Sequence, residues 1–139
     1  MRDTVTDAYT IMRALDAPDY TGDAPGAFHG YARPMGAEQI AFNLRILEPG
    51  TVHMPPGGDP TAGHAHATIE ELYFVLEGEI TAKLGDDVVL LERWDAVLIA
   101  PETPRSVRND TLERSAFALV SVKVTDHATE SMPVQSFWP

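Results

Sequence analysis

Alternation of apolar and polar residues marks the chain from Glu38 onward. In QIAFNLRIL, residues 39–47, the large apolar side chains occupy positions 40, 42, 44 and 46, with smaller or polar residues between them. A period of two is typical of a half-buried β-strand. The following Glu48-Pro49-Gly50 ends this strand, and HMPPGGDPTAG, residues 53–63, has the composition of a loop.

Further strands follow at short intervals. ELYFVLEGEITAKL (71–84) predicts two strands that meet near Glu77-Gly78, and Gly85-Asp86-Asp87 predicts a second tight turn. DAVLIAPETPRSVRN (95–109) predicts a strand, a proline-bounded turn and another strand, and SAFALVSVKV (115–124) predicts the last strand. About eight short strands at intervals of roughly ten residues indicate a single all-β domain, either a barrel or a sandwich.

The two ends of the chain are less regular. We divide the sequence into an N-terminal arm (1–35), a β-barrel (36–125) and a C-terminal tail (126–139). Within the arm, apolar residues at positions 5, 8, 9, 12 and 15 have helical spacing, but YTIM (9–12) fits an edge strand equally well. In the tail, Phe137 and Trp138 are too apolar to remain exposed, so we expect the tail to pack on the barrel or on a dimer partner.

Composition and charge narrow the function. The chain has 139 residues, a formal net charge of −11 and no cysteine. The negative charge argues against nucleic acid or an anionic membrane as partner, and the lack of cysteine excludes disulfides, thiolate zinc sites and a cysteine nucleophile. The N-terminus has no apolar run long enough for a signal peptide, and no stretch reaches membrane-spanning length, so we expect a cytoplasmic protein.

Candidate metal ligands are concentrated in GHAHATIEELYFVLEG, residues 63–78. His64 and His66 project from one face if this segment is extended, because strand residues two apart point the same way. Glu71 begins the next strand, and a carboxylate at the head of an apolar strand needs a partner inside the protein. Two imidazoles side by side suit a divalent transition metal, which would be that partner.

The same segment resembles the first sequence motif of the cupin superfamily. Five positions match that motif at every spacing: Gly58, His64, His66, Glu71 and Gly78. The resemblance, which extends over residues 38–122, implies a cupin double-stranded β-helix, a jelly-roll-like barrel that is commonly dimeric and has its site inside. We therefore expect a homodimer and a divalent metal (Fe, Mn, Ni, Zn or Cu) held by the two histidines and the glutamate.

The second cupin motif is matched only in part. In WDAVLIAPETPRSVRN (94–109), Asp95, Pro101 and Asn109 are retained, whereas Trp94 and Glu102 stand in place of glycines. Arg105 stands where the motif has its fourth metal ligand, a histidine. A guanidinium has no lone pair to offer, and its charge about 5 Å from a divalent ion would cost roughly 6–7 kcal/mol at an effective dielectric constant of about 20.

Three arrangements of Arg105 are compatible with the sequence. It can swing away and leave a three-ligand site open to substrate or oxygen, pair with Glu71 in a metal-free site, or hold an anionic substrate beside a weakly bound metal. His53, at the start of the long loop, is a candidate extra ligand. Tyr73 and Phe42 are candidates for lining the substrate pocket.

These features predict a metal-centred or metal-derived pocket that acts on a small polar or anionic molecule. Dioxygenase, isomerase and lyase chemistry all fit, and the fold cannot choose among them. The alternative is a non-catalytic binding or sensor protein in which a Glu71–Arg105 pair replaces the metal.

Overall fold

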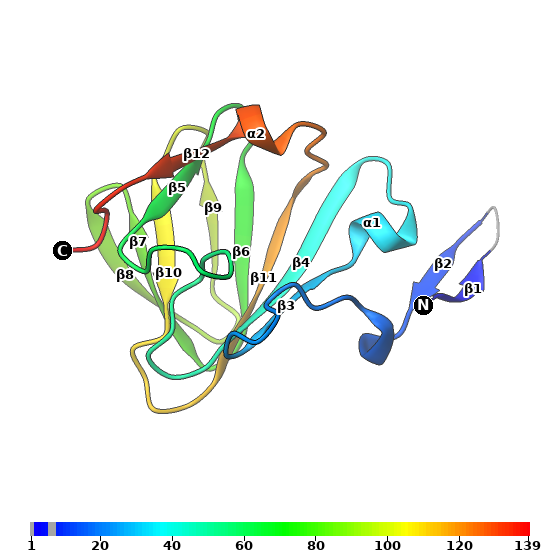
Figure 1. Ribbon diagram of the computed structural model, residues 1–139, viewed down its shortest axis with the longest axis horizontal. Helices are drawn as coiled ribbons and strands as arrows, with labels where there is room; N and C mark the ends of the chain where they lie inside the picture. The colour runs from blue at the N-terminus through cyan, green and yellow to red at the C-terminus, as the bar shows by residue number, and fades with distance from the viewer. Residues whose placement is uncertain (1, 6–7) are drawn as a thin grey trace.

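The computed structural model describes residues 2–5 and 8–139 and consists mainly of β-strands (Figure 1), which confirms the predicted all-β class. The strands are β1 (Arg2–Val5), β2 (Thr10–Met12), β3 (Ala27–Gly30), β4 (Ile40–Leu47), β5 (Gly63–His66), β6 (Glu71–Glu77), β7 (Glu79–Leu84), β8 (Asp87–Glu92), β9 (Ala96–Ile99), β10 (Arg105–Arg108), β11 (Ser115–Val122) and β12 (Ser131–Val134). The helices are a 3-10 turn, η1 (Ala14–Asp16), and two short α-helices, α1 (Ala32–Met35) and α2 (His127–Glu130).

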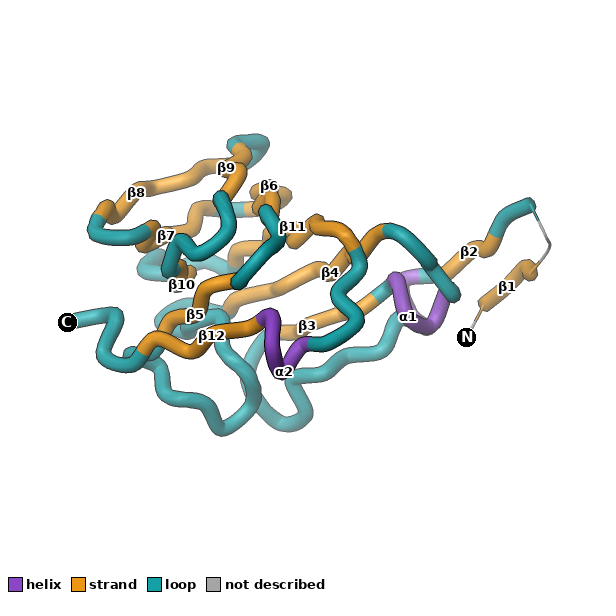
Figure 2. Tube along the Cα trace, turned by 90° about the horizontal axis from the view of Figure 1, so that it is seen from above, coloured by secondary structure: helices purple, strands orange, loops and turns teal. Residues whose placement is uncertain are grey.

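Ten of these strands form two five-stranded antiparallel sheets. The first sheet has the order β12-β5-β10-β7-β8 and the second has the order β3-β4-β11-β6-β9. Strands β1 and β2 pair only with each other, and they project from the side of the molecule next to α1 (Figures 1 and 2). No described helix is long and apolar enough to cross a membrane.

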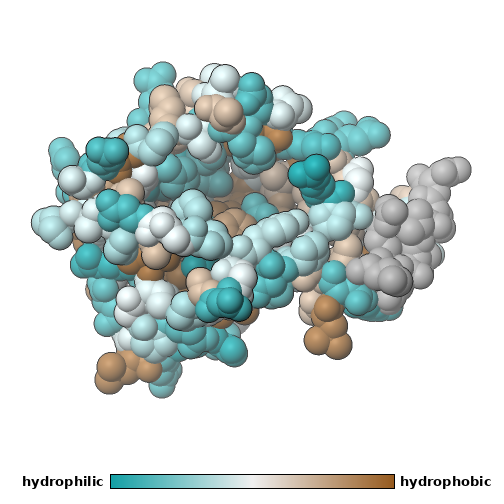
Figure 3. Space-filling model, viewed as in Figure 1, coloured by the Kyte–Doolittle hydropathy of each residue, from teal (hydrophilic) through white to brown (hydrophobic). Residues whose placement is uncertain are grey.

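The hydrophobic core lies between the two sheets and is built from inward-facing residues of both. Its buried members are Leu47, Tyr73, Val75, Ile80, Ala82, Ile99, Val107, Phe117 and Leu119. Removing these side chains from water is the main stabilisation of the barrel. On the face shown in Figure 3, hydrophilic residues predominate around the rim, and hydrophobic residues are visible deep in the middle.

Strand β4 forms where the alternation predicts it, but its larger apolar residues face outward. Leu47 belongs to the core, so Arg45, two positions earlier, also faces inward and is only 3% exposed. Ile40 and Phe42 lie on the opposite face and are 60% and 37% exposed. Alternation therefore locates the strand without telling which of its faces meets the core.

Left-handed backbone conformations terminate several strands. Gly78 joins β6 to β7 with φ 68°, and a Cβ atom there would lie 2.7 Å from the carbonyl oxygen of Arg114. Trp94, between β8 and β9, has φ 75°, and Glu102, between β9 and β10, has φ 67°. Both residues keep the conformation that glycine adopts most easily, at the two positions where the resembled motif has glycine.

Both sheets extend beyond the boundaries predicted for the barrel, residues 36–125. Strand β3 pairs with β4, and β12 pairs with β5 from Ser131 to Val134. The prediction that residues 115–124 form the last strand was therefore wrong. Strand β12 is four residues long and contains Pro133, which is tolerated because β12 is an edge strand. In the arm, residues 10–12 form a strand, while positions 6 and 7 of the alternative helix lie outside the described residues.

The C-terminal tail lies on the outer face of the first sheet. Trp138 is buried, its Nε1–H donates to Ser106 Oγ at 2.7 Å, and the Arg108 guanidinium lies 4.0 Å from its ring centroid. Phe137 packs over Gly63, where a Cβ atom would come within 2.6 Å of the phenyl ring. The glycine that opens β5 thus makes room for the tail.

Candidate metal centre

The structure brings His64, His66 and Glu71 together at one end of the space between the sheets. The two imidazole centroids are 5.2 Å apart, and His66 Nε2 lies 3.6 Å from Glu71 Oε1. One potential ligand atom from each of the three residues lies within 4.8 Å of the others. Both histidines come from β5 in the first sheet and the glutamate from β6 in the second, so the group bridges the two sheets.

The connection between β5 and β6 is held by a buried carboxylate. Glu130, at the end of α2, accepts hydrogen bonds from the backbone N–H groups of Thr68 and Ile69, each at 2.9 Å, and from the Thr68 hydroxyl at 2.7 Å. These bonds fix the path of the chain over the few residues that separate His66 from Glu71. The loop held by Glu130 therefore places the Glu71 carboxylate next to the two histidines.

Arg105 faces the same space as the histidines. It pairs directly with His64 in the β10–β5 ladder, so the two side chains project from the same face of the sheet. Its side chain is fully buried, and none of its three guanidinium nitrogens has a hydrogen-bond partner among the described residues. Among those residues the Glu71 carboxylate contacts the ring of His66, and Arg105 forms no ion pair with Glu71.

Tyr73 follows Glu71 on the inward face of β6. It is fully buried against Phe117, with ring centroids 5.2 Å apart, and among the described residues its hydroxyl has no hydrogen-bond partner. Burial and the neighbouring Glu71 carboxylate raise the pKa of Tyr73 well above its ordinary value. The residue therefore presents a protonated hydroxyl beside Glu71.

The electrostatics favour a neutral His64 and an ionised Glu71. Burial lowers the pKa of His64 to about 4, with the Arg105 charge acting in the same direction and Glu71 against it. Burial opposes ionisation of Glu71, but its contacts with His66 and Tyr73 and the Arg105 charge outweigh burial, and the pKa lies below the ordinary value. Neutral imidazole and carboxylate are the forms that coordinate metals.

These residues meet the requirements of a divalent transition metal. Ligand atoms about 2.0–2.2 Å from a tetrahedral ion lie roughly 3.5 Å from one another, so a group within 4.8 Å closes on an ion with small side-chain rotations. His66 Nδ1 and Glu71 Oε1 are buried and have no hydrogen-bond partner in the part of the chain that the structure describes. Buried polar atoms of this kind call for a ligand or an ion.

Phe42 lies elsewhere, which corrects the expectation that it lines the pocket. It projects from the outer face of β4, where its ring meets that of Tyr31 with centroids 5.7 Å apart. The inward positions of β4 belong instead to odd-numbered residues, among them Arg45. One signal for this arrangement is visible in the sequence, namely a charged residue inside a largely apolar strand.

His53 lies beside the three-residue group and is not a member of it. Its ring centroid is 6.4 Å from that of His64, and its Nδ1 accepts a hydrogen bond from Arg45 Nε at 3.1 Å. Burial and the charge of Arg45 lower the pKa of His53 to about 3. The partner of this ring is therefore an arginine that sequence analysis did not single out.

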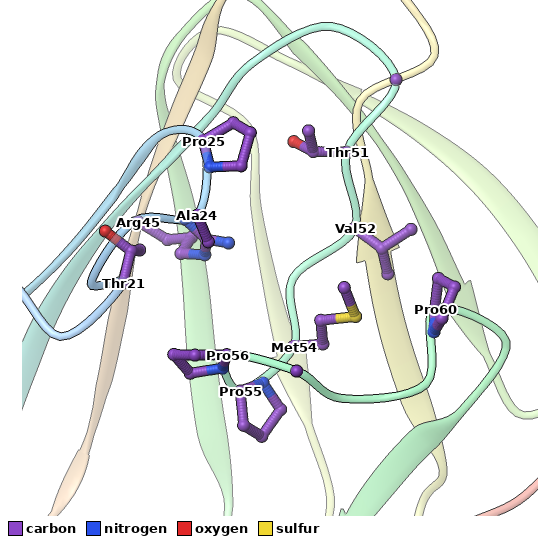
Figure 4. A pocket seen from close by; sticks show the side chains of 12 residues that line it. Thr21, Ala24, Pro25, Arg45, Thr51, Val52, Met54, Pro55, Pro56 and Pro60 are labelled. Atoms are coloured by element: carbon purple, nitrogen blue, oxygen red, sulfur yellow. The ribbon is translucent and has the colours of Figure 1, made fainter.

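A separate cavity of about 190 Å³ lies under the proline-rich loop, residues 54–62 (Figure 4). Its walls include Thr21, Arg45, Val52, Met54 and Pro60, and none of the three candidate ligands lines it. Arg45 lines this cavity and also contacts His53.

The fold and the site together define a small antiparallel β-barrel with a two-histidine, one-carboxylate group between its sheets. Comparison with known families agrees: the family description "Cupin domain" matches residues 50–122, which is more than half of the chain. The chain belongs to the cupin family, and its fold is the cupin double-stranded β-helix.

Solved structures support the same fold. A cupin protein from Bacteroides fragilis superimposes with a TM-score of 0.67 at 19% identity, covering 87% of this chain and 89% of that one. A putative sugar phosphate isomerase from Acidithiobacillus ferrooxidans gives 0.60 at 18% identity, with 82% and 75% covered. Oxalate decarboxylase from Lactobacillus farciminis, in a formate complex, gives 0.65 at 14% identity, with 86% and 33% covered.

Similarity to curated sequences is shorter. An uncharacterized protein of Methanocaldococcus jannaschii is 35% identical over 54 residues, which is 39% of this chain and 43% of that protein. The match thus spans less than half of that relative's length.

Proposed function

We propose that this protein binds a divalent transition metal through His64, His66 and Glu71 and holds a small anionic molecule beside it with Arg105. The observation that carries the proposal is the buried guanidinium of Arg105, whose three nitrogens have no hydrogen-bond partner within residues 2–5 and 8–139. A buried charge without a partner is costly. An anion in the pocket would supply the missing hydrogen bonds, in a geometry that suits carboxylate or another oxyanion.

The charges of the site support an anionic rather than a neutral ligand. Glu71 offsets only part of the charge of a dication and a guanidinium, so the loaded site would keep an excess of positive charge. When bound, the metal would supply a Lewis acid to an oxygen of the ligand. Arg105 would orient the anionic group, and the protonated hydroxyl of Tyr73 is a further donor on the same side of the barrel.

Geometry does not favour the metal-free alternative. That reading needs a Glu71–Arg105 pair to fill the site, whereas the carboxylate of Glu71 lies 3.6 Å from His66 and the guanidinium has no described partner. The solved structures similar in fold include a putative sugar phosphate isomerase and an oxalate decarboxylase. The reaction class of this chain stays open between isomerase, lyase and dioxygenase chemistry.

Two variants test the proposal by calorimetric titration, first with Zn²⁺ and then with oxalate, a small dicarboxylate, added to the zinc-loaded protein. His64→Ala should abolish tight Zn²⁺ binding. Arg105→Gln should keep Zn²⁺ binding and weaken oxalate binding at least about 10-fold, as expected for loss of a charge-assisted hydrogen bond. Arg114→Gln, which removes an exposed arginine, is the matched control. Wild-type protein that binds neither Zn²⁺ nor oxalate would refute the proposal.

We further propose that the chain forms a homodimer through the outer face of the second sheet. Strand register places four apolar residues in one row across β4, β11, β6 and β9: Phe42, Val120, Leu72 and Leu98. Leu98 is 60% exposed and Leu76, on the same face, is 41% exposed. An apolar face of this kind supports an interface.

A second copy of the chain is the occupant that the charge distribution favours. The chain has a net charge of −11, so two copies repel each other over most of their surfaces. The outward positions of β4, β11, β6 and β9 hold no acidic or basic residue. On this face two copies can approach without bringing like charges together, and a two-fold axis would make one patch its own partner.

A further inference from the structure

His53 is held against the strand that carries Arg105. Its backbone N–H donates to the carbonyl of Val107 at 2.8 Å, and Val52 forms a bridge with Arg108. Arg108 lies on the outer face of the first sheet, under Trp138, so Val52 is outward and the next side chain, His53, is inward. Residues 52 and 53 thus pair with the same edge of β10 that β5 pairs with at Arg105.

The inward ring of His53 is enclosed by the residues of the candidate site and the core. Its centroid lies 6.4 Å from that of His64, 5.6 Å from that of Phe117 and 5.3 Å from that of Phe28. Arg105 lies opposite His64 on β10, and His53 lies next to His64 along the edge of the same strand. Among the described residues, none accepts a hydrogen bond from His53 Nε2.

Arg45 determines which nitrogen of His53 carries the proton. Its Nε–H donates to His53 Nδ1 at 3.1 Å, while Nη1 donates to the carbonyls of Ala27 at 3.0 Å and Ile46 at 2.9 Å. A guanidinium is always protonated and offers no acceptor, so the nitrogen that it meets must be bare. The proton of the imidazole therefore sits on Nε2, on the other side of the ring.

This arrangement removes both nitrogens from metal coordination. Nδ1 uses its lone pair on Arg45, and Nε2 has none to offer while it carries the proton. Coordination through Nε2 would require the proton to move to Nδ1, where it would face the Arg45 N–H. The group of atoms close enough to share an ion accordingly contains His64, His66 and Glu71 without His53.

We propose that His53 is a fixed Nε2–H donor to the anionic ligand, held in that role by Arg45, and is not a fourth metal ligand. The inference deepens the proposed function and rests on it. Two donors, His53 and Arg105, then each adjoin His64, and they select a ligand that presents an oxygen to each, such as a small dicarboxylate or another oxyanion with two acceptor atoms. Arg45 acts through His53 and is a positioning residue.

The protonation of His53 can be read directly, without any metal. Two-bond ¹⁵N–¹H correlation spectra of the full-length, metal-free protein should show His53 as the Nε2–H form, and adding Zn²⁺ should leave that form unchanged. His53→Gln identifies its signals. An Nδ1–H form, or a shift of the ring to a metal-bound nitrogen on adding Zn²⁺, would overturn the inference.

Two substitutions separate the two nitrogens. In His53→Asn the amide oxygen can still accept from Arg45 but the far donor is lost, whereas in His53→Gln the amide reaches the position of Nε2 and can donate. Zn²⁺ affinity should stay within about 3-fold of wild type in both. Oxalate affinity of the zinc-loaded protein should fall about 10-fold in His53→Asn and less in His53→Gln, as for one lost hydrogen bond to a charged group.

A loss of Zn²⁺ affinity of 10-fold or more in both variants would make His53 a ligand and overturn the inference. Unchanged oxalate affinity in both would also overturn it. If wild-type protein binds no Zn²⁺, the proposed metal site fails. The proton position and oxalate binding to the metal-free protein then still decide the role of His53, because neither depends on the ion.

Discussion

Arg105 and His64 face each other directly across the pairing of β10 with β5, and both side chains point between the sheets. The position from which this family usually supplies a fourth metal ligand therefore still points into the site, with a cation in place of a donor nitrogen. Arginine at this position leaves the backbone of the site unchanged but places a positive charge where the family has a metal ligand.

Restoring histidine at this position should create a four-ligand site. Arg105→His removes a positive charge that faces the ion, adds a nitrogen donor and places it opposite His64. We expect affinity for Zn²⁺ or Ni²⁺ to rise by orders of magnitude, most strongly above about pH 6.5, where an ordinary imidazole is neutral. Isothermal titration of both forms measures the change, with His64→Ala as the negative control. If wild type already binds as tightly as the variant, another group must complete the coordination.

Glycine at the two left-handed turn positions should stabilise the fold. Trp94 and Glu102 have φ of 75° and 67°, a conformation that costs a residue with a Cβ atom roughly 1–2 kcal/mol. Part of that gain is lost because glycine is more flexible when unfolded. We expect Trp94→Gly and Glu102→Gly each to raise the free energy of unfolding by about 0.5–1 kcal/mol in urea titrations. Glu113→Gly, at an exposed position with negative φ, should give no such increase. A similar increase there would contradict the attribution of the gain to the left-handed conformation.

Stability should fall as the solution becomes acidic, because two histidines are buried in neutral form. The folded pKa values are about 3 for His53 and about 4 for His64, against 6.5 for a free histidine. Below about pH 6.5 the unfolded chain binds protons that the folded chain does not, so stability is complete above that pH and is lost towards pH 4. Each histidine contributes a slope of up to about 1.4 kcal/mol per pH unit. Urea titrations between pH 7 and 4.5 should show a shallower slope for His53→Asn, and an unchanged slope would contradict the assignment.

The C-terminal tail should contribute measurably to the stability of the barrel. Trp138 is 5% exposed and donates to Ser106. Trp138→Ala should lower the free energy of unfolding by about 3 kcal/mol. Trp138→Phe, which loses mainly the hydrogen bond, should lower it by about 1 kcal/mol. Deleting residues 134–139 should lower the melting temperature further. Trp94→Phe, at a tryptophan that is 66% exposed, is the control and should stay within about 0.5 kcal/mol.

A charge on the outer face of the second sheet should separate the proposed dimer. Leu98→Glu introduces a carboxylate at a 60% exposed position in the apolar row, so the barrel should tolerate it while the interface should not. Leu112→Glu makes the same change at a leucine that is 96% exposed in a loop. Sedimentation at micromolar concentration should give a monomer for the first variant and a dimer for the second and for wild type. A wild-type mass near 15 kDa would refute the dimer.

Sequence patterns predicted most strands of the barrel, but not β3 or β12, and they predicted the meeting of His64, His66 and Glu71. Those predictions depend on local rules, namely the alternation of side chains along a strand and the turn chemistry at Gly78. Strand β12 escaped prediction because four residues with a proline carry no periodic signal, and its position depends on pairing with β5.

The faces of β4 could not be read from its sequence. Apolar residues occupy one side of this strand, yet that side is the outer one, while Arg45 faces the interior. Alternation gives two possible orientations, and contacts with β11 and β3 choose between them. The same limit hid the Arg45–His53 hydrogen bond, which joins residues on different elements and depends on the three-dimensional position of both.

The hydrogen bonds on either side of the proline-rich loop have a consequence for divergence. At one end of the loop the His53 backbone N–H donates to the Val107 carbonyl in β10. At the other end the loop runs into β5 at Gly63, and β5 pairs with the same strand. The intervening residues, 54–62, cover the 190 Å³ cavity without supplying any of the three candidate ligands. This span can therefore change in length or composition while both of its ends stay in place, so the cavity can diverge without any change in the three candidate ligands.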